Sequence, residues 1–367
     1  MRMRSLAVES LSVRGFRNLA AVDVAFGSRF NVVSGENGQG KTNLLEAVYT
    51  LATSRSFRTS KIVDLVQSGG QSASLRARVV EDGETREQSV GVRPGLRVAH
   101  MDGKRTVLLA GYAVRTPVVV FHPGLAGLSA GSGAERRRLL DRLALYLWPA
   151  SLADAESYVK AARARQRVLE VRGERASDLD GWEELMVRHG LALSDAREKA
   201  AEQLGESAVQ TFARIGPADA LQTRYERSAP AEAEGFRKAL ATSRPRDRAR
   251  GSATIGPHRD DLGLTLGGRP VRGIASQGQH RAVVLALVLA ETHVIAEARG
   301  VRPILLLDDV SSELDRSRTA ALLRALCERQ GQVILTTTRP ELFETNDSFG
   351  GEDRRDFAVA GGRIEAA

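Results

Sequence analysis

The sequence predicts an α/β fold: a mixed sheet with helices, and an α-helical domain inserted into it. Apolar and polar residues alternate through much of residues 1–120, as they do in half-buried strands. From Ala134 onward the apolar period becomes helical, and two nearly continuous apolar runs after residue 300 are typical of buried parallel strands. We therefore expect one domain built from both ends of the chain, residues 1–132 and 251–367, around a helical insertion, residues 133–250.

The N-terminal segment is expected to form antiparallel strands. Leu6–Val13 and Ala21–Phe26 alternate regularly, and the pattern roughly repeats at 74–80, 88–93, 96–101 and 105–109. Turn signals separate the later segments at Asp82-Gly83, Pro94-Gly95 and Asp102-Gly103. Two-residue turns of this kind join antiparallel neighbours.

The insertion is expected to be a pair of antiparallel helices packed along a narrow seam. Apolar residues recur at about 3.5-residue spacing from Leu152 to Leu169 and from Trp182 to Phe212, with a polar breaker between them. The basic segment Ser243–Arg250 is interpreted as a linker. Beyond it the pattern predicts an apolar helix ending near Arg299, a helix at 317–329, and buried strands at 303–309 and 333–337.

The composition is that of a folded cytoplasmic protein. Of its 367 residues, 42% are hydrophobic and 27% are charged. The single cysteine, Cys327, excludes an internal disulfide. The longest apolar run, Ala282–Ala290, is far shorter than the roughly 20 residues of a membrane span. No apolar stretch follows the early arginines, as it would in a secretory signal.

Positive charge is concentrated at the start of the chain. The net charge is +8, and residues 1–150 hold 21 Lys and Arg against 12 Asp and Glu. A basic surface favours a polyanionic partner such as DNA, although a solvated arginine-rich surface gives the same counts. Two clusters are candidates for phosphate contact: Arg136, Arg137 and Arg138, and the group of Arg55, Arg58 and Lys61.

A motif of the form GxxxxGKT predicts a nucleotide-binding loop between the apolar strand Phe30–Ser34 and a helix. It consists of Gly35, Glu36, Asn37, Gly38, Gln39, Gly40, Lys41 and Thr42. Glycines let successive N–H groups face one concavity at the positive end of the helix. Lys41 is expected to reach the β- and γ-phosphates of ATP, and the Thr42 hydroxyl to bind Mg²⁺. The alternative is a glycine-rich turn with a chance lysine.

A pair of acids ends the apolar run at 304–307. Asp308 is expected to hold Mg²⁺, directly or through water, and Asp309 to act as general base on the attacking water. The alternative for both is a simple turn. The position at which ABC ATPases have a switch histidine reads Thr336-Thr337-Thr338. That substitution, with Asp instead of Glu at position 309, suggests slow hydrolysis.

Two further segments resemble the loops that ABC ATPases use between subunits. Ser276, Gln277, Gly278 and Gln279 open the long apolar helix and resemble the signature motif. In ABC dimers this motif closes on the γ-phosphate held by the partner subunit, so ATP becomes part of the interface. Ser311–Asp315 resembles the loop that crosses to the partner, which places Asp315 near the nucleotide. A plain helix cap is the alternative for each segment.

Six segments, in order along the chain, resemble the RecF family of bacterial recombination and gap-repair ATPases. They are Val13–Leu19, GENGQGKTNLLEAVYTLATSRSFR from Gly35, GPHRDDL from Gly256, SQGQHRAVVLALVLAE from Ser276, LLLDDVSSELD from Leu305 and TTTR from Thr336. The positions that match the family's motifs are Lys41, Thr42, Ser276, Gly278, Gln279, Asp308, Asp309 and Asp315. One departure stands at His122–Leu125, where the family usually has a proline followed by two acids.

The resemblance implies an ABC-type ATPase head, similar to that of SMC proteins but without their long arms, and an inserted helical domain. It implies an ATP-dependent homodimer on single- and double-stranded DNA, at gaps or junctions, with slow ATP hydrolysis as a switch. It also implies work with RecR and RecO in loading RecA, and a link to the SOS response.

Two other functions stay open. An SMC-like nuclease would use Asp260 and Asp261 as metal ligands, although no further acid or histidine cluster completes a two-metal site. A loop that exposes both charges is the simpler interpretation of this pair. A nucleotide-switched scaffold would bind other proteins and no DNA.

Overall fold

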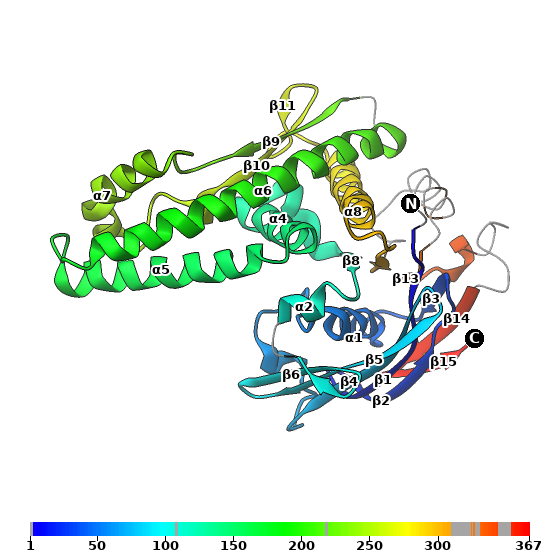
Figure 1. Ribbon diagram of the computed structural model, residues 1–367. Coiled ribbons are helices and arrows are strands. Elements are labelled where there is room, and N and C mark those ends of the chain that lie inside the picture. Colours follow the sequence, from blue (N-terminus) through cyan, green and yellow to red (C-terminus); the bar gives the residue numbers. More distant parts are fainter. Residues whose placement is uncertain are drawn as a thin grey trace. The chain divides into compact units, whose positions relative to one another are not determined.

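The fold comes from a computed structural model, which describes residues 3–106, 109–216, 219–309, 324, 326, 331–343 and 354–367. The chain divides into two compact units (Figure 1). Unit 1 consists of Met1–Ala126, Thr211–Pro217 and Gln277–Ala367, and unit 2 of Gly127–Gln210 and Ala218–Ser276. None of the described helices is long and apolar enough to cross a membrane.

Unit 1 contains an antiparallel sheet of six strands. Their spatial order is β2 (Leu19–Ala25), β1 (Leu6–Phe16), β4 (Ala73–Glu81), β5 (Glu84–Arg93), β6 (Leu96–Met101) and β7 (Lys104–Arg105). Asp82 and Asp102 both have φ near +50°, the conformation that two-residue hairpin turns require. The alternating segments and their turn signals therefore predicted these hairpins.

The expected strand at 105–109 is wrong. β7 ends at Arg105, and a short helix, α2, runs over Leu109–Ala113. Its Tyr112 is fully buried, and the phenol donates a hydrogen bond to the Leu51 carbonyl oxygen at 2.6 Å. Packing of this ring against the core decides the local structure, which a short apolar run cannot reveal.

A second six-stranded sheet completes unit 1. Its spatial order is β15 (Arg363–Ala366), β14 (Arg354–Ala360), β3 (Phe30–Ser34), β13 (Val333–Thr337), β12 (Ile304–Leu307) and β8 (Val118–Phe121). All pairs are parallel except the terminal hairpin of β14 and β15. β12 and β13 are buried along their whole length, as their continuous apolar sequences predicted.

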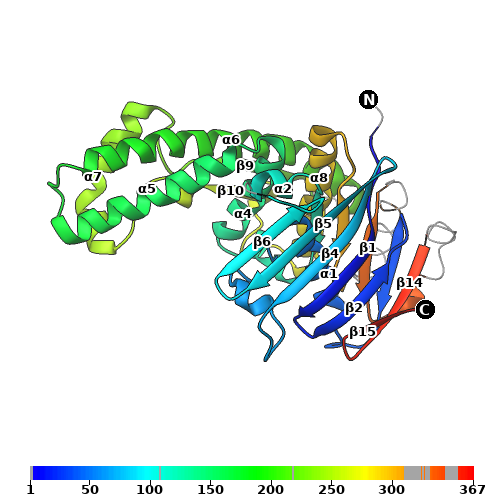
Figure 2. The same ribbon diagram turned by 60° about the horizontal axis from the view of Figure 1, so that its bottom comes forward.

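Two helices fill the core of unit 1. α1 (Lys41–Thr53) contacts strands of both sheets, and nearly all of its residues are buried. Figure 2 shows the antiparallel sheet in front of α1. The long apolar helix α8 (Gln277–Arg299) packs against β8. The described residues of the unit also form the 3₁₀ helices η1 (Ile62–Leu65), η2 (Pro123–Ala126) and η4 (Pro340–Phe343).

Unit 2 is mainly helical. Its helices are α3 (Gly127–Ala130), α4 (Gly133–Leu147), α5 (Ser151–Arg172), α6 (Leu179–Ile215, whose last turn counts with unit 1), α7 (Ala233–Arg250) and the 3₁₀ helix η3 (Pro257–Arg259). α5 and α6 run side by side in both views (Figures 1 and 2). They correspond to the expected helix pair.

Unit 2 differs from the expected insertion in two respects. It begins at residue 127 and extends to Ser276, so residues 251–276 do not belong to the unit of the C-terminal strands. It also contains a three-stranded antiparallel sheet, in the order β11 (Arg269–Pro270), β10 (Asp261–Leu266) and β9 (Leu221–Glu226). Pairing with β9 along its whole length holds β10 in this unit.

The segment Ser243–Arg250 is part of α7 and is not a linker, although it contains Pro245. Its side chains are tied to the neighbouring helices. Arg244 contacts Glu183 of α6 at 2.6 Å, and Asp247 contacts the buried Arg165 of α5 at 2.7 Å. These ion pairs outweigh the helix-breaking tendency of a proline and a run of like charges.

Candidate nucleotide-binding site

The loop Gly35–Gly40 joins β3 to α1, and its glycines have backbone conformations that other residues rarely adopt. The φ angles are 151° at Gly35, 81° at Gly38 and 119° at Gly40. A Cβ atom on Gly35 would lie 2.5 Å from the carbonyl oxygen of Val359. Positive φ and close backbone approach both require glycine, so the motif's spacing follows from the geometry of the turn.

Lys41 begins α1 and folds back over the loop. Its Nζ donates hydrogen bonds to the carbonyl oxygens of Gly35 at 2.5 Å and Glu36 at 2.8 Å. Burial lowers the pKa of Lys41, while the charges of Asp309, Asp308 and Glu36 oppose that shift. The site therefore combines an ammonium group with the positive end of a helix, which together favour a bound anion.

Thr42 and Asp308 meet, although 266 residues separate them in the chain. The Thr42 hydroxyl lies 2.9 Å from Oδ1 and 3.0 Å from Oδ2 of Asp308. Burial raises the pKa of Asp308, and hydrogen bonds from Thr336 and Thr42 limit that rise. A hydroxyl and a carboxylate at the start of α1 are the oxygen ligands that Mg²⁺ prefers. These two residues fit the predicted metal site.

Asp309 is half-buried and has a left-handed φ of 50°. Its N–H donates to the Thr336 hydroxyl at 2.9 Å, and that hydroxyl donates to Asp308 Oδ1 at 2.8 Å. Thr336 therefore links the two acids at the ends of neighbouring parallel strands. Thr336 lies where ABC ATPases have the switch histidine, and its hydroxyl contacts both acidic residues. The sequence did not reveal this structural role.

The remaining predicted nucleotide residues come from the segment around Ser276. Gln277, Gly278 and Gln279 form the first turn of α8, and Ser276 directly precedes it. Ser276 and Gln277 are exposed. Asp315, with the rest of Ser311–Asp315, lies outside the described residues, as do Cys327 and most of the expected helix at 317–329.

A buried cluster around Glu46 of α1 was not predicted from the sequence. Glu46 is fully buried, and its carboxylate accepts hydrogen bonds from Arg17 at 2.8 Å, Ser56 at 2.5 Å and Arg58 at 3.2 Å. Arg58 also donates to Asn43 at 2.7 Å. Arg58, a candidate for phosphate contact, is thus engaged beside the loop. Arg58 had been singled out only as part of a basic group, and for the others the only signal was that they fall in two of the family-like segments.

The expected acidic loop at Asp260 and Asp261 is wrong. Asp260 is fully buried and accepts hydrogen bonds from Ser194 at 2.7 Å and the Ser228 N–H at 2.7 Å. Asp261 forms an ion pair with Arg136 at 2.7 Å. Across the described residues, no group of three or more His, Cys, Asp or Glu is placed to hold a metal ion. Both acids stabilise the interior of unit 2.

The cluster Arg136–Arg138 is mostly structural as well. Arg136 is buried and also donates to the carbonyl oxygen of Leu128 at 3.0 Å. Arg137 donates to the carbonyl oxygen of Asp260 at 2.7 Å, and Arg138 pairs with Glu135 within the same helix. Three adjacent arginines in the sequence therefore do not make a basic patch.

Comparison with known proteins agrees with this geometry. A family model described as the RecF/RecN/SMC N-terminal domain matches residues 7–355. The DNA replication and repair protein RecF of Anaeromyxobacter sp. (strain Fw109-5) is 40% identical over 365 residues, covering 97% of this chain and 98% of the relative. The chain belongs to the RecF family. A RecF from Myxococcus xanthus (strain DK1622) is 39% identical, covering 99% of this chain and 97% of its own.

Solved structures show the same relationship. A structure of the recombination mediator protein RecF with ATP, in the RecFOR pathway, has a TM-score of 0.89 and 27% identity, covering 99% of this chain and 98% of that one. An Smc head bound to the C-terminal winged-helix domain of ScpA has a TM-score of 0.57 at 16% identity, a likeness of fold alone. The resemblance to RecF and the predicted fold class, an ABC/SMC-like head with an added helical part, are confirmed.

Proposed function

We propose that this chain is an ATP-switched DNA-binding protein of replication and recombinational gap repair that works in the cytoplasm. The observation that carries the proposal is the meeting of the glycine loop, Lys41, Thr42 and Asp308 in one site. Support comes from RecF relatives that are named for DNA replication and repair, and from RecF structures that contain ATP.

In this proposal the loop N–H groups and the α1 N-terminus bind the phosphates of ATP. Lys41 exchanges its two carbonyl partners for the β- and γ-phosphates. Thr42 and Asp308 hold Mg²⁺, which neutralises phosphate charge when bound. Asp309, aligned by Thr336, accepts the proton of the attacking water. Because aspartate reaches less far than glutamate and the switch position holds threonine instead of histidine, the protein is a weak ATPase that acts as a switch.

Dimerisation is the proposed output of the switch. Ser276, Gln277, Gly278 and Gln279 of one subunit close on the γ-phosphate in the other, and Asp315 lies in the crossing loop. The exposure of Ser276 and Gln277 at the start of α8 leaves them accessible to a partner subunit. ATP stabilises the dimer because it binds that state more tightly than the monomer, and hydrolysis removes this preference.

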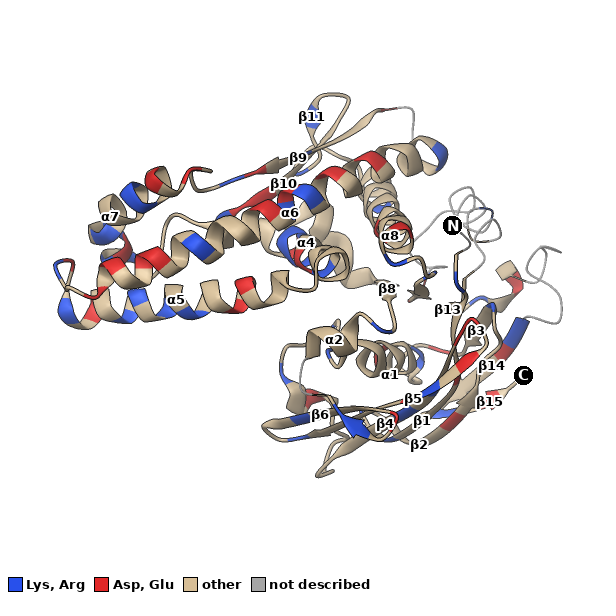
Figure 3. Cartoon of the chain, in the orientation of Figure 1, with Lys and Arg blue, Asp and Glu red and all other residues tan. Residues whose placement is uncertain are grey.

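A cationic row on α5 supports the proposed contact with DNA. Lys160, Arg163 and Arg167 are exposed, and their spacing of three and four residues places them on one helix face. Within the described part of the chain, none of the three forms an ion pair. Glu156 and Glu170 flank the row, and Glu170 accepts a hydrogen bond from Gln166 at 2.9 Å. Blue segments recur along α5 in Figure 3.

The dimensions of the row suit a phosphate backbone. Seven residues of α-helix span about 10 Å. Phosphates of one DNA strand follow each other at about 3.4 Å along the duplex axis, so the row covers roughly three of them. Arginine and lysine with no internal carboxylate partner keep their full attraction for a polyanion, and their binding is expected to depend on salt.

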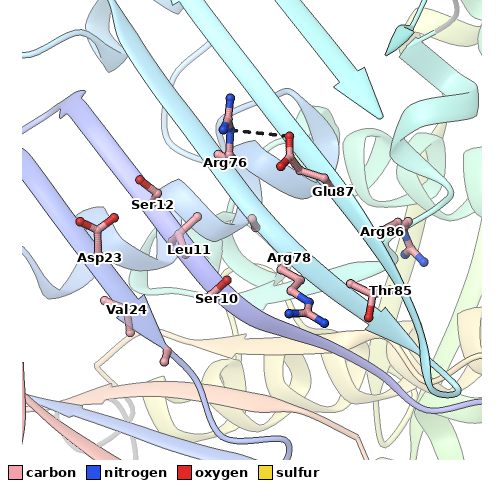
Figure 4. A pocket seen from close by; sticks show the side chains of 12 residues that line it. Ser10, Leu11, Ser12, Asp23, Val24, Arg76, Arg78, Thr85, Arg86 and Glu87 are labelled. Atoms are coloured by element: carbon pink, nitrogen blue, oxygen red, sulfur yellow. Dashed lines mark ion pairs between the residues drawn. The ribbon is translucent and has the colours of Figure 1, made fainter. Parts of the chain in front are cut away.

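The antiparallel sheet provides a contrast. Arg14, Arg76 and Arg78 lie on its outer face, each beside an acid: Asp23 at 2.7 Å, Glu87 at 3.6 Å and Glu9 at 2.8 Å respectively. Figure 4 shows the hollow on this face, with the pair of Arg76 and Glu87 across it. Each of these arginines is paired with a neighbouring carboxylate, so the three make a matched control for the row on α5.

The experiment compares two triple variants, Lys160→Gln/Arg163→Gln/Arg167→Gln and Arg14→Gln/Arg76→Gln/Arg78→Gln. Affinity for gapped DNA is measured across a series of salt concentrations with ATP and Mg²⁺. The first variant should bind more weakly, with a log–log salt slope lower by up to about 2.7, or about 0.9 for each contact. The second should stay close to wild type.

The outcomes separate the competing functions. An unchanged slope in the α5 variant would remove the row from the DNA interface. A wild-type protein that binds no DNA at any salt concentration would favour the nucleotide-switched scaffold. We further propose that RecR, with RecO and RecA acting downstream, are partners, because RecF structures are assigned to the RecFOR pathway. Co-elution with RecR on size-exclusion chromatography tests that contact.

A further inference from the structure

The hairpin turn between β14 and β15 is hydrogen-bonded to the nucleotide-binding loop. Oε1 of Gln39 accepts a hydrogen bond from the Gly361 N–H at 2.7 Å. The carbonyl oxygen of Gln39 accepts one from the Gly362 N–H at 2.9 Å. One loop residue is therefore fastened, through both its side chain and its backbone, to two successive amides near the end of the chain.

Asn18, in the turn between β1 and β2, fills the space between the loop, α1 and the hairpin. Its Nδ2 donates to the Gln39 carbonyl oxygen at 3.2 Å, and its Oδ1 accepts from Asn43 of α1 at 2.7 Å. A Cβ atom on Gly40 would lie 3.0 Å from that Oδ1. A Cβ atom on Gly362 would lie 2.4 Å from the Asn18 carbonyl oxygen. The backbone of the hairpin thus contacts both Gln39 and Asn18, and the Asn18 side chain contacts the loop.

The same hairpin also supports the beginning of the loop. β14 runs parallel to β3, and the Ser34 hydroxyl donates to the Phe357 carbonyl oxygen at 3.1 Å. Gly35 packs against the backbone of Val359. Contacts with β14 and its turn thus extend from residue 34 to residue 39, along one side of the loop.

We propose that Asn18 and Gly362 are positioning residues for the phosphate-binding loop. The reason lies in the planarity of the peptide unit. In a trans peptide the C=O and the following N–H point in opposite directions. Because the Gln39 oxygen is bonded to the hairpin, the N–H of Gly40 must point away from it, into the concavity of the loop. The inference rests on the proposed binding of ATP at this loop. It identifies the residues that orient the loop N–H groups toward the phosphates.

The two neighbouring glycines of the turn provide a matched pair of variants. Both have positive φ, 53° at Gly361 and 78° at Gly362, so an alanine strains the backbone at either position. A Cβ atom on Gly361 meets nothing within 4 Å, whereas one on Gly362 collides with Asn18. Gly362→Ala must shift the hairpin or Asn18, both of which are hydrogen-bonded to the loop, and Gly361→Ala need not.

The readout is the Kd for a fluorescent ATP analogue with Mg²⁺, compared with thermal unfolding without nucleotide. We expect Gly362→Ala to weaken binding roughly tenfold and Gly361→Ala to change it by less than about twofold. Asn18→Ala removes the hydrogen bond to the Gln39 oxygen without altering a glycine, and should also weaken binding. It keeps the test decisive if Gly362→Ala does not fold.

A purely structural role for the turn would lower the thermal midpoint of folded Gly362→Ala and leave its Kd at the wild-type value, which would overturn the inference. Wild-type Kd in Asn18→Ala would do the same. If the wild-type protein itself does not bind the analogue, the proposed function fails instead. The two failures are therefore distinguishable in a single titration series.

Discussion

Asp308 and Lys41 occupy buried positions that disfavour their charges. Burial raises the pKa of the carboxyl and lowers that of the amine. Both residues fall in motifs that the sequence displays plainly, because phosphate binding restricts the residue types in the loop. Thr336 was noted only as the replacement of a switch histidine, and Asn18 only as part of a family-like segment, so the contacts that they make were not predicted. Their roles depend on where two turns and a strand end meet in space, and residue type alone does not encode that.

Asp308→Asn should stabilise the protein at neutral pH. Because folding raises the pKa of this carboxyl, its contribution to stability is present below the ordinary value of about 3.9 and is lost as pH rises through the raised value. Asparagine stays neutral, so the gain in thermal midpoint should be largest near pH 7 and shrink toward pH 4. Thermal unfolding without nucleotide or Mg²⁺ at several pH values measures it.

Asp23 provides the control of opposite sign. A hydrogen bond from Arg14 lowers its pKa, so its contribution is present above the ordinary pKa and is lost as pH falls. Asp23→Asn should therefore bring no gain at pH 7, and a slight loss at most, because the group is exposed. An Asp308→Asn protein less stable than wild type at pH 7 would contradict the assigned burial of its charge.

Among the elements, those with a regular pattern on a buried face were predicted, and those that depend on distant partners were not. β12, β13 and the early hairpins fall where their apolar periods placed them. β14 and β15 went unrecognised because their sequences mix charges with apolar residues. α7 was mistaken for a linker because its sequence is basic and contains proline, and its helical state depends on acids of other helices.

Arg165 is the centre of the ion-pair network that holds α7. It is fully buried, and it contacts Glu183 at 2.9 Å and Asp247 at 2.7 Å. Arg165→Met should destabilise unit 2 by about 3–5 kcal/mol, because it leaves the buried Asp247 carboxylate without its cation and takes one of two arginines from Glu183. Denaturant unfolding measures the loss. Arg138→Met, which removes an exposed pair on α4, should stay near wild type. Equal losses in both variants would contradict this account.

At the scale of the whole molecule, the sequence identified the family and the motifs, and through the shared Mg²⁺ it brought Thr42 and Asp308 together, but the contact of the loop with the C-terminal hairpin was not predicted. Family-like segments follow each other in the right order over most of the chain, which is why their combination is specific. The pairing of Gln39 with Gly361 joins residues hundreds of positions apart. Such pairings follow from strand order in the sheet, which local patterns do not determine.

The whole-molecule claim is that ATP forms part of a dimer interface. Ser276→Arg should bind ATP and remain a monomer, because it blocks the surface that closes on the partner's nucleotide. Asp309→Asn should accumulate as a dimer, because ATP stays bound without hydrolysis. Lys41→Met should bind no ATP and remain a monomer. Nucleotide affinity, measured separately for each variant, distinguishes failure to bind from failure to associate.

Molar mass by light scattering, with and without ATP and Mg²⁺ in the presence of duplex DNA, tests this claim most directly. We predict a monomer without nucleotide and a dimer with it, and no shift in Ser276→Arg. A wild-type protein that stays monomeric under all conditions, or a Ser276→Arg protein that dimerises normally, would contradict the assignment of Ser276–Gln279 and the switch built on it.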